Sequence, residues 1–480
     1  MNKLLSQYRN MSRQIKASLW FVVSNVLVKG ISFFTLPVFS RLLTTGEYGT
    51  VSVYQSWVSV ISIITTLTIW GGGFNVGMVK YPEQEAKMIS SFQGLAVSLT
   101  MAAAIISLLL LPQLEPLLEL SGFLILCMYL EILAQIPFNL WATEQRYNYE
   151  YKKLITATVI ISILSPLAGI AAVLHTSHKP EARIISNLSV QLAAGIILFF
   201  HNQKKGRKFF EREFWKFGFS FNIVLIPHYL SMQILNQSDR IMIHNICGES
   251  DAGIYSAAYN FAMLMSLFIN GINSSLTPYL YQCLQKRNTA GLQKQVTAVV
   301  LLVAVLATGL IAIIPDIFHL LLPESYYPAL KVIPPVTAGM FFLFLYPLFG
   351  AVEFYFEENR YVTLASIAGA LLNIILNYIF IPLYGFPAAA YTTLFCYICF
   401  SICHYMFMKI ILKKRKLDME IYDIRSLAVI SCTVIAGSVL MVSVYDRPAV
   451  RWILIFLISS ILVRKRMYFK SLLNIMRQKG

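Results

Sequence analysis

Charged side chains are scarce in this chain of 480 amino acids. Only 13% of its residues are Asp, Glu, Lys or Arg, whereas a soluble domain carries roughly a quarter. Hydrophobic residues make up 57% of the sequence. The loops expected on the external side are also short, and none could fold as a domain or hold a large extracytoplasmic catalytic site. These deficits exclude an ordinary water-soluble globular protein.

Cysteine is infrequent and unpatterned, and recognisable catalytic motifs are missing. The seven cysteines lie mostly within apolar segments, which argues against a disulfide framework. Cys396, Cys399, Cys403 and His404 fall on roughly one face of an expected helix and superficially resemble a metal site. Cysteine within a membrane span usually behaves as a small hydrophobe, however. We therefore predict no metal, no cofactor and no enzymatic activity.

Long apolar runs are abundant. Stretches such as LTMAAAIISLLLLP and VTAVVLLVAVLATGLIAII approach the roughly 20 residues that a helix needs to cross a bilayer. The basic start, MNKLLSQYRNMSRQIK, lacks a cleavage site, so no removable signal peptide is expected. The sequence predicts an all-α polytopic membrane protein with about fourteen spans, near residues 17–39, 50–71, 92–111, 122–142, 154–174, 184–201, 217–238, 253–280, 296–315, 332–352, 362–382, 387–408, 426–445 and 449–463.

The formal charge of +16 could suggest a nucleic-acid partner, so the position of the basic residues decides its meaning. With the N-terminus inside, most of the 39 Lys and Arg residues fall in cytoplasmic segments of this map. That asymmetry is the positive-inside pattern. It predicts that both termini are cytoplasmic and that nucleic acid is not a partner.

Two related strings indicate an internal repeat. TTGEYGTVSVYQSW and GESDAGIYSAAYNF each place an acid two residues before a glycine, Gly49 or Gly253. The acid can cap a helix start, and the glycine lets the backbone turn into it. We predict two six-helix lobes related by pseudo-two-fold symmetry about an axis normal to the membrane. Their expected bounds are 1–203 and 217–412, joined by a basic cytoplasmic linker at 204–216 and followed by a helix pair and basic tail at 413–480.

Lys29 lies near the middle of the first predicted span, and Asn25 precedes it by one turn. A charge within a span costs roughly 2.5–3.5 kcal/mol on insertion scales, so it needs a partner or a watery cavity. Snorkelling is the alternative, but the lysine stem hardly reaches water from mid-membrane. We therefore expect Lys29 and Asn25 to face a cavity in which the lysine meets an anion.

Glu131, Gln135 and Asn139 recur every fourth residue, which places a carboxylate and two amides on one helix face. Glu131 is the most central acidic residue of the predicted map. Amides often hold membrane helices together, and packing is a fair alternative role. We expect Gln135 and Asn139 to line the cavity, and Glu131 is a candidate for ion or proton coupling.

The seventh predicted span is the most polar, and Pro227 is expected to bend it. It contains Asp239, a second candidate for ion coupling, and Arg240, which suits a phosphate oxygen. A salt bridge to another helix explains this pair about equally well. Amides on later spans can hydrogen-bond sugar hydroxyls, although helix packing explains them nearly as well; they are Asn270, Asn273, Asn373 and Asn377.

Two strings together resemble a known family: FFTLPVFSRLLTTGEYGTVSVY at 33–54 and NQSDRIMIHNICGESDAGIYSAAYNF at 236–261. They are similar to the polysaccharide-export branch of the multidrug/oligosaccharidyl-lipid/polysaccharide superfamily, which includes the Wzx-type O-antigen flippases. The matching positions are Leu36, Pro37, Arg41, Leu42, Leu43, Glu47, Tyr48 and Gly49 in the first string, and Asp239, Arg240, Gly248, Gly253, Tyr255, Ser256 and Ala257 in the second.

The resemblance implies a flippase in the bacterial cytoplasmic membrane. Such a protein moves an undecaprenyl-diphosphate-linked oligosaccharide to the outer leaflet by alternating access, for O-antigen, capsule or exopolysaccharide assembly. Membrane lipids and polymerase or chain-length proteins are the implied partners, and the last two helices would border a groove for the lipid tail.

Two alternatives remain open at this point. A drug/cation antiporter of the same superfamily typically has twelve spans and an acidic first-lobe site, whereas the first helix here carries Lys29 and no acid. A membrane polysaccharide polymerase usually presents a sizeable basic external loop. The longest external segment expected here, near 316–331, is short and poorly charged.

Overall fold

The computed structural model describes residues 12–286, 291–417 and 420–464, and within these ranges all of the regular secondary structure is helical. The chain divides into two compact units, Met1–Gly253 and Ile254–Gly480. The first contains α2 (Arg13–Leu42), α3 (Thr45–Thr66), α4 (Gly72–Lys80), α5 (Glu85–Leu109), α6 (Leu111–Leu118), α7 (Gly122–Tyr147), α8 (Tyr151–Leu174), α9 (Lys179–Gly206), α10 (Arg212–Ile223), α11 (Ile226–Cys247) and the start of α12 (Glu249–Ala262).

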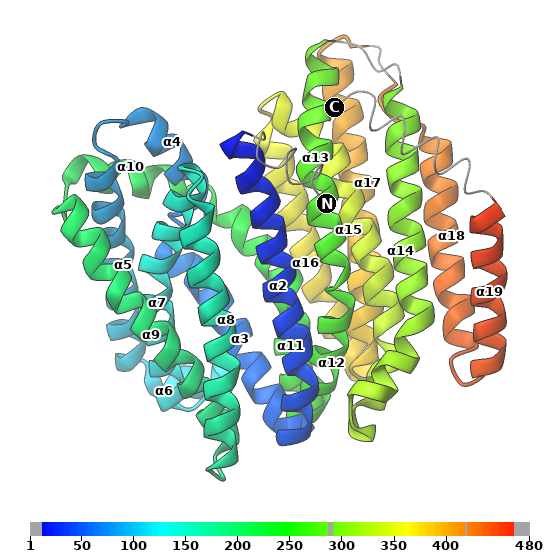
Figure 1. Ribbon diagram of the computed structural model, residues 1–480, viewed down its shortest axis with the longest axis horizontal. Helices are drawn as coiled ribbons and strands as arrows, with labels where there is room; N and C mark the ends of the chain where they lie inside the picture. The colour runs from blue at the N-terminus through cyan, green and yellow to red at the C-terminus, as the bar shows by residue number, and fades with distance from the viewer. Residues whose placement is uncertain (1–11, 287–290, 418–419, 465–480) are drawn as a thin grey trace, which may run out of the picture. The chain divides into compact units, whose positions relative to one another are not determined.

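The second unit holds the rest of α12 and a further set of long helices (Figure 1). They are α13 (Met265–Gln285), α14 (Leu292–Leu321), the short 3-10 helix η1 (Glu324–Lys331), α15 (Ile333–Tyr355), α16 (Asn359–Tyr384), α17 (Pro387–Lys414), α18 (Ile424–Ser443) and α19 (Pro448–Arg464).

Each of the fourteen predicted spans coincides with helix in the structure. Within the described residues, ten helices are long and apolar enough to cross a membrane, and α12 with α13 adds an eleventh if the bent pair is one span. The predicted span at 217–238 is broken: α10 ends at Ile223 and α11 begins at Ile226, with Pro227 in its first turn. Proline there costs no helical hydrogen bond, because the first amides of a helix have no partner within it. The protein is a multi-pass membrane protein.

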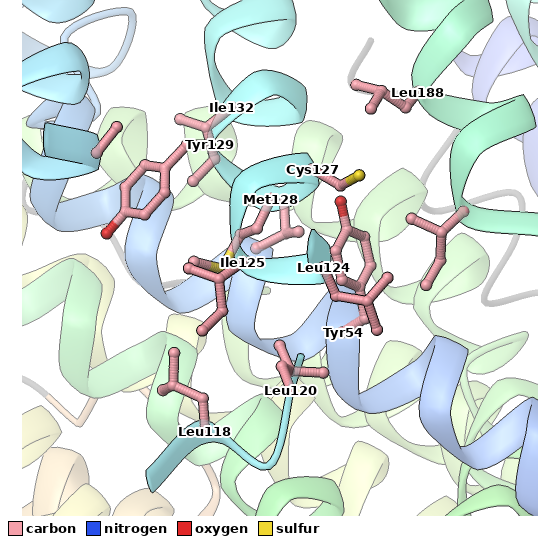
Figure 2. Packing of buried hydrophobic residues seen from close by; sticks show 13 residues of the cluster. Tyr54, Leu118, Leu120, Leu124, Ile125, Cys127, Met128, Tyr129, Ile132 and Leu188 are labelled. Atoms are coloured by element: carbon pink, nitrogen blue, oxygen red, sulfur yellow. The ribbon is translucent and has the colours of Figure 1, made fainter. Parts of the chain in front are cut away.

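Apolar contacts hold each unit together. In the first unit a cluster centres on α7, where Leu124, Met128 and Ile132 pack against Tyr54 of α3 and Leu188 of α9 (Figure 2). The phenol of Tyr54 is the notable polar group among these side chains. In the second unit α15 is the central helix, and most of its residues are buried.

The last two helices are fastened to α14. Ile311 and Ala312 pack against Met441 and Val444 of α18, and α18 and α19 lie beside α14 in Figure 1. Arg451 of α19, which is 1% exposed, bonds Asp316 through Nη2 and Oδ1 at 2.5 Å.

The repeated strings meet at their glycines inside the first unit. Thr44 and Glu47 form a reciprocal capping box at the start of α3, as the acid in the repeat predicted. The expected role of the glycines as turning points was wrong, because Gly49 lies within α3 and Gly253 within α12. A Cβ atom on Gly49 would lie 1.9 Å from the Glu249 carbonyl oxygen, and one on Gly253 would lie 1.9 Å from the Thr45 carbonyl oxygen. Glycine is needed here so that the two backbones can touch.

Candidate functional site

A single carboxylate, that of Glu131, is the hub of a polar network inside the first unit. Its side chain is fully buried, and donors from three helices converge on its two oxygens. Tyr54 Oη donates to Oε2 at 3.0 Å. The other donors are side-chain amides within 3.2–3.3 Å of Oε1, contributed by Gln55 of α3, Gln135 of α7, and Asn187 and Gln191 of α9.

The sequence spacing accounts for this convergence. Asn187 and Gln191 lie four residues apart on α9, as Glu131 and Gln135 do on α7, so each pair shares one helix face. Four amides crowd one carboxylate oxygen, which has only two lone pairs. Each amide can rotate to present oxygen in place of nitrogen. The network can therefore surround Glu131 with donors or acceptors, and it suits a group that gains and loses a cation or proton.

Arg183 extends the same stripe of α9, four residues before Asn187. Its guanidinium lies over the Phe39 ring, 4.3 Å from the ring centroid, and it interacts electrostatically with Glu131. Gly169 makes room for it, because a Cβ atom there would lie 2.9 Å from Nη1. Nη1 is buried without a hydrogen-bond partner among the described residues. This cation can therefore still donate a hydrogen bond to an oxyanion.

Arg240 of the seventh predicted span belongs to a second network, between α3 and α11. Ser56 donates to Gln237 at 3.1 Å, and Arg240 bonds the same amide oxygen and also the Asn236 carbonyl at 3.1 Å. Asp239 is 1% exposed. Arg240 is thus held by the α11 backbone and by an amide that reaches α3.

The other predicted residues are dispersed. Lys29 and Asn25 are exposed on α2, and Asn139 is half-buried on α7. In the second unit Asn270 is exposed and Asn273 half-buried. Asn377 donates to Asn373 at 3.2 Å, and these two buried amides bond two threonines of α17, Thr393 at 3.0 Å and Thr392.

The structure brings together Glu131 with Gln135, and Asn373 with Asn377, as their spacing predicts. Sequence analysis missed four contributors to the Glu131 network: Tyr54, Gln55, Asn187 and Gln191. Sequence analysis gave no role to Arg183. The four-residue spacing of Arg183, Asn187 and Gln191 was the available signal, since the same spacing had singled out Glu131.

Comparison with known proteins decides the family. A family model described as polysaccharide biosynthesis protein matches residues 15–284, more than half of the chain. The chain belongs to this family. A second model, MatE, matches residues 225–379 of this polysaccharide biosynthesis family member.

Curated relatives and solved structures agree with the assignment. The chain is 23% identical to "Lsg locus putative protein 1" of Haemophilus influenzae, over 75% of this chain and 89% of that protein. It is 25% identical to "Succinoglycan biosynthesis transport protein ExoT" of Rhizobium meliloti, over 59% and 57% respectively. Its fold is similar to the lipid II flippase MurJ in an inward closed conformation, with a TM-score of 0.66, 17% identity and coverage of 94% and 100%. A MATE-family multidrug transporter matches with a TM-score of 0.60, 12% identity and coverage of 83% and 96%.

Proposed function

We propose that this polysaccharide biosynthesis family member is a flippase that carries an undecaprenyl-diphosphate-linked oligosaccharide from the inner to the outer leaflet of the bacterial cytoplasmic membrane. The observation that carries the proposal is the network in which the fully buried carboxylate of Glu131 interacts with the half-buried Arg183 inside a helix bundle. Ionisable groups in membrane spans mark substrate or ion pathways, because burying them without such a role is costly. Transport, not catalysis, is the activity that such a network supports.

The cations are proposed to bind the diphosphate. Arg183 has a free, buried donor, and guanidinium groups suit phosphate oxygens. Lys29 and Arg240 are proposed as further contacts. The amide side chains Asn25, Gln135, Asn139, Asn270, Asn273, Asn373 and Asn377 would hydrogen-bond sugar hydroxyls. The two predicted lobes, 1–203 and 217–412, would rock about the site, and both termini would be cytoplasmic.

Ion coupling is assigned to Glu131, with Asp239 as a second candidate. Five donors surround Glu131, so Glu131→Gln keeps the network bonded while removing its ability to titrate. We expect this variant to fold normally and to lose the dependence of transport on the proton or sodium gradient. Unchanged gradient dependence would reassign Glu131 to packing.

The test of the flippase itself uses purified protein in liposomes and a fluorescent undecaprenyl-diphosphate-linked disaccharide as the probe. We expect Lys29→Ala and Arg183→Ala to stop flipping, Lys29→Arg to retain part of it, and Lys153→Ala to change nothing. Lys153 is the matched control because its side chain is 68% exposed. Full activity of Lys29→Ala and Arg183→Ala would remove these cations from the site.

A cation-coupled drug antiporter is the second candidate, and the MatE match over 225–379 favours it. Liposomes that extrude a cationic dye but leave the diphosphate-linked probe in place would support the antiporter over the flippase. Partner polymerase or chain-length proteins are expected only for the flippase.

A further inference from the structure

The second unit contains a buried acid–imidazole pair that plays no part in the network around Glu131. Glu353 of α15 and His404 of α17 are both fully buried, and Nδ1 of the histidine lies 2.7 Å from Oε1 of the glutamate. Each also has a second polar atom, Glu353 Oε2 and His404 Nε2, which is buried without a hydrogen-bond partner among the described residues. The pair therefore has unused capacity to bind something small.

The number of protons that the pair holds follows from the distance between its two polar atoms. Carboxylate oxygens and an unprotonated imidazole nitrogen are both acceptors, so a contact of 2.7 Å requires one proton between them. With that proton alone the pair carries a net negative charge. A second proton, added at Nε2, makes an imidazolium–carboxylate pair with no net charge. Because a net charge buried in the protein is costly, the pair is built to take up this second proton.

Among the residues that the structure describes, no lysine or arginine forms an ion pair with Glu353 that would balance the charge. On α15 and α17 the titratable groups facing the pair are Tyr346, whose ring centroid is 5.1 Å from the imidazole, and Cys403, which interacts electrostatically with Glu353. Tyr422, just before α18, donates to the Leu348 carbonyl. In the described parts of α13, α14, α16 and α18, no charged side chain forms an ion pair or hydrogen bond with Glu353 or His404.

A pocket with a charged lining lies one turn further along α17. This pocket of about 400 Å³ is lined by Tyr405, Met408 and Lys409 of α17, and by Asp423 and Arg425 at the start of α18. Met408 follows His404 by four residues and so lies on the same helix face. The charged lining makes this pocket a site for water, one helical turn from His404 along α17.

We propose that Glu353 and His404 form a proton-binding site in the second unit, which takes up a proton at Nε2 from water in this pocket and releases it by the same route. Uptake forms one N–H bond, and release breaks it, with no other reactant. That this proton helps to drive transport rests on the proposed flippase function; its binding does not.

The decisive experiment follows the imidazoles by nuclear magnetic resonance in full-length protein labelled with nitrogen-15 histidine and held in lipid nanodiscs. His404→Gln identifies the His404 signal among the seven histidines. We expect this signal to pass from neutral to doubly protonated as the pH is lowered over the range in which the protein stays folded. In Glu353→Gln, where the amide keeps the hydrogen bond, we expect His404 to stay neutral throughout. His319→Gln, at an exposed position of the same unit, should leave the His404 titration unchanged.

Two outcomes would overturn the site: a His404 signal that stays in one state throughout, or a titration that is the same in Glu353→Gln. Flipping of the diphosphate-linked probe separates the site from its coupling role. If His404 titrates as expected but flipping by the wild type does not depend on a proton gradient, the pair binds a proton without driving transport. Absence of flipping with an intact titration counts against the proposed function alone.

Discussion

Replacing Gly49 with alanine tests the glycine contact between α3 and α12 most directly. The added Cβ atom would lie 1.9 Å from a backbone oxygen of Glu249, and ordinary contact begins near 3.4 Å. No side-chain rotation can relieve the overlap, so the two backbones must separate by about 1.5 Å. Overpacking of this kind typically costs about 1–3 kcal/mol, which corresponds to a loss of roughly 5- to 150-fold in the population of the closed contact.

Disulfide trapping reports this population. Thr45 Oγ1 lies 2.7 Å from Ser250 Oγ, so cysteines at these two positions, in a background without the native cysteines, should cross-link rapidly under mild oxidation. We expect Gly49→Ala to slow the cross-link by tenfold or more. Gly30→Ala is the control, because a Cβ atom there has nothing within 4 Å.

The double variant gives a sharper prediction. Gly253 makes the reciprocal contact with the Thr45 carbonyl. Once the first alanine has separated the helices, the second should add little, so the two effects should not be additive. Cross-linking of Gly49→Ala at the parental rate would refute the reasoning, and additive losses would show that each glycine acts alone.

Two further predictions concern the second unit. Arg451→Met should lower the thermal unfolding temperature and expose α19 to protease. The loss of folding free energy should be less than the roughly 3–5 kcal/mol of a broken, fully buried ion pair, because the Asp316 side chain is 38% exposed. Arg447→Met, at an exposed position, is the control. Equal effects of the two variants would contradict the ion-pair role of Arg451. A hydrogen bond from Lys414 holds the pKa of Glu358 below its usual value. The stabilisation that this hydrogen bond gives is complete above the ordinary carboxyl pKa of about 4.3 and is lost as pH falls through the lower pKa of the folded protein. Lys414→Met should therefore make the melting temperature fall less steeply as the pH is lowered into the acid range. An unchanged dependence of the melting temperature on acid pH would exclude this role.

Hydropathy predicted the helices well because it responds to one term, the cost of burying polar backbone and charge in hydrocarbon. All fourteen expected segments are helical, and even the break near Pro227 follows from proline chemistry. The role of Gly49 was not predicted, because the sequence alone cannot distinguish a glycine that allows a turn from one that allows two helix backbones to approach closely. That distinction depends on which backbone lies opposite.

The candidate site was harder to predict, because convergence of helices is a property of tertiary packing. Glu131 and Gln135 could be grouped by their spacing within one helix. Tyr54 and Asn187 could not, since they are 77 and 56 residues from Glu131. His404 drew attention for its cysteine neighbours, whereas the partner that the structure gives it is Glu353, 51 residues away.

The polar networks also explain why α3 and α11 are not among the ten described helices that are long and apolar enough to cross a membrane. Both α3 and α11 have 22 residues, enough at about 1.5 Å per residue to cross roughly 30 Å of hydrocarbon. Their polar side chains are bonded to each other or to the Glu131 network: Ser56 to Gln237, and Gln55 to Glu131. Pairing offsets the cost that an average over single residues assigns to them. A count from mean hydropathy therefore omits two helices whose polar groups are bonded inside the protein, and these helices carry much of the candidate site.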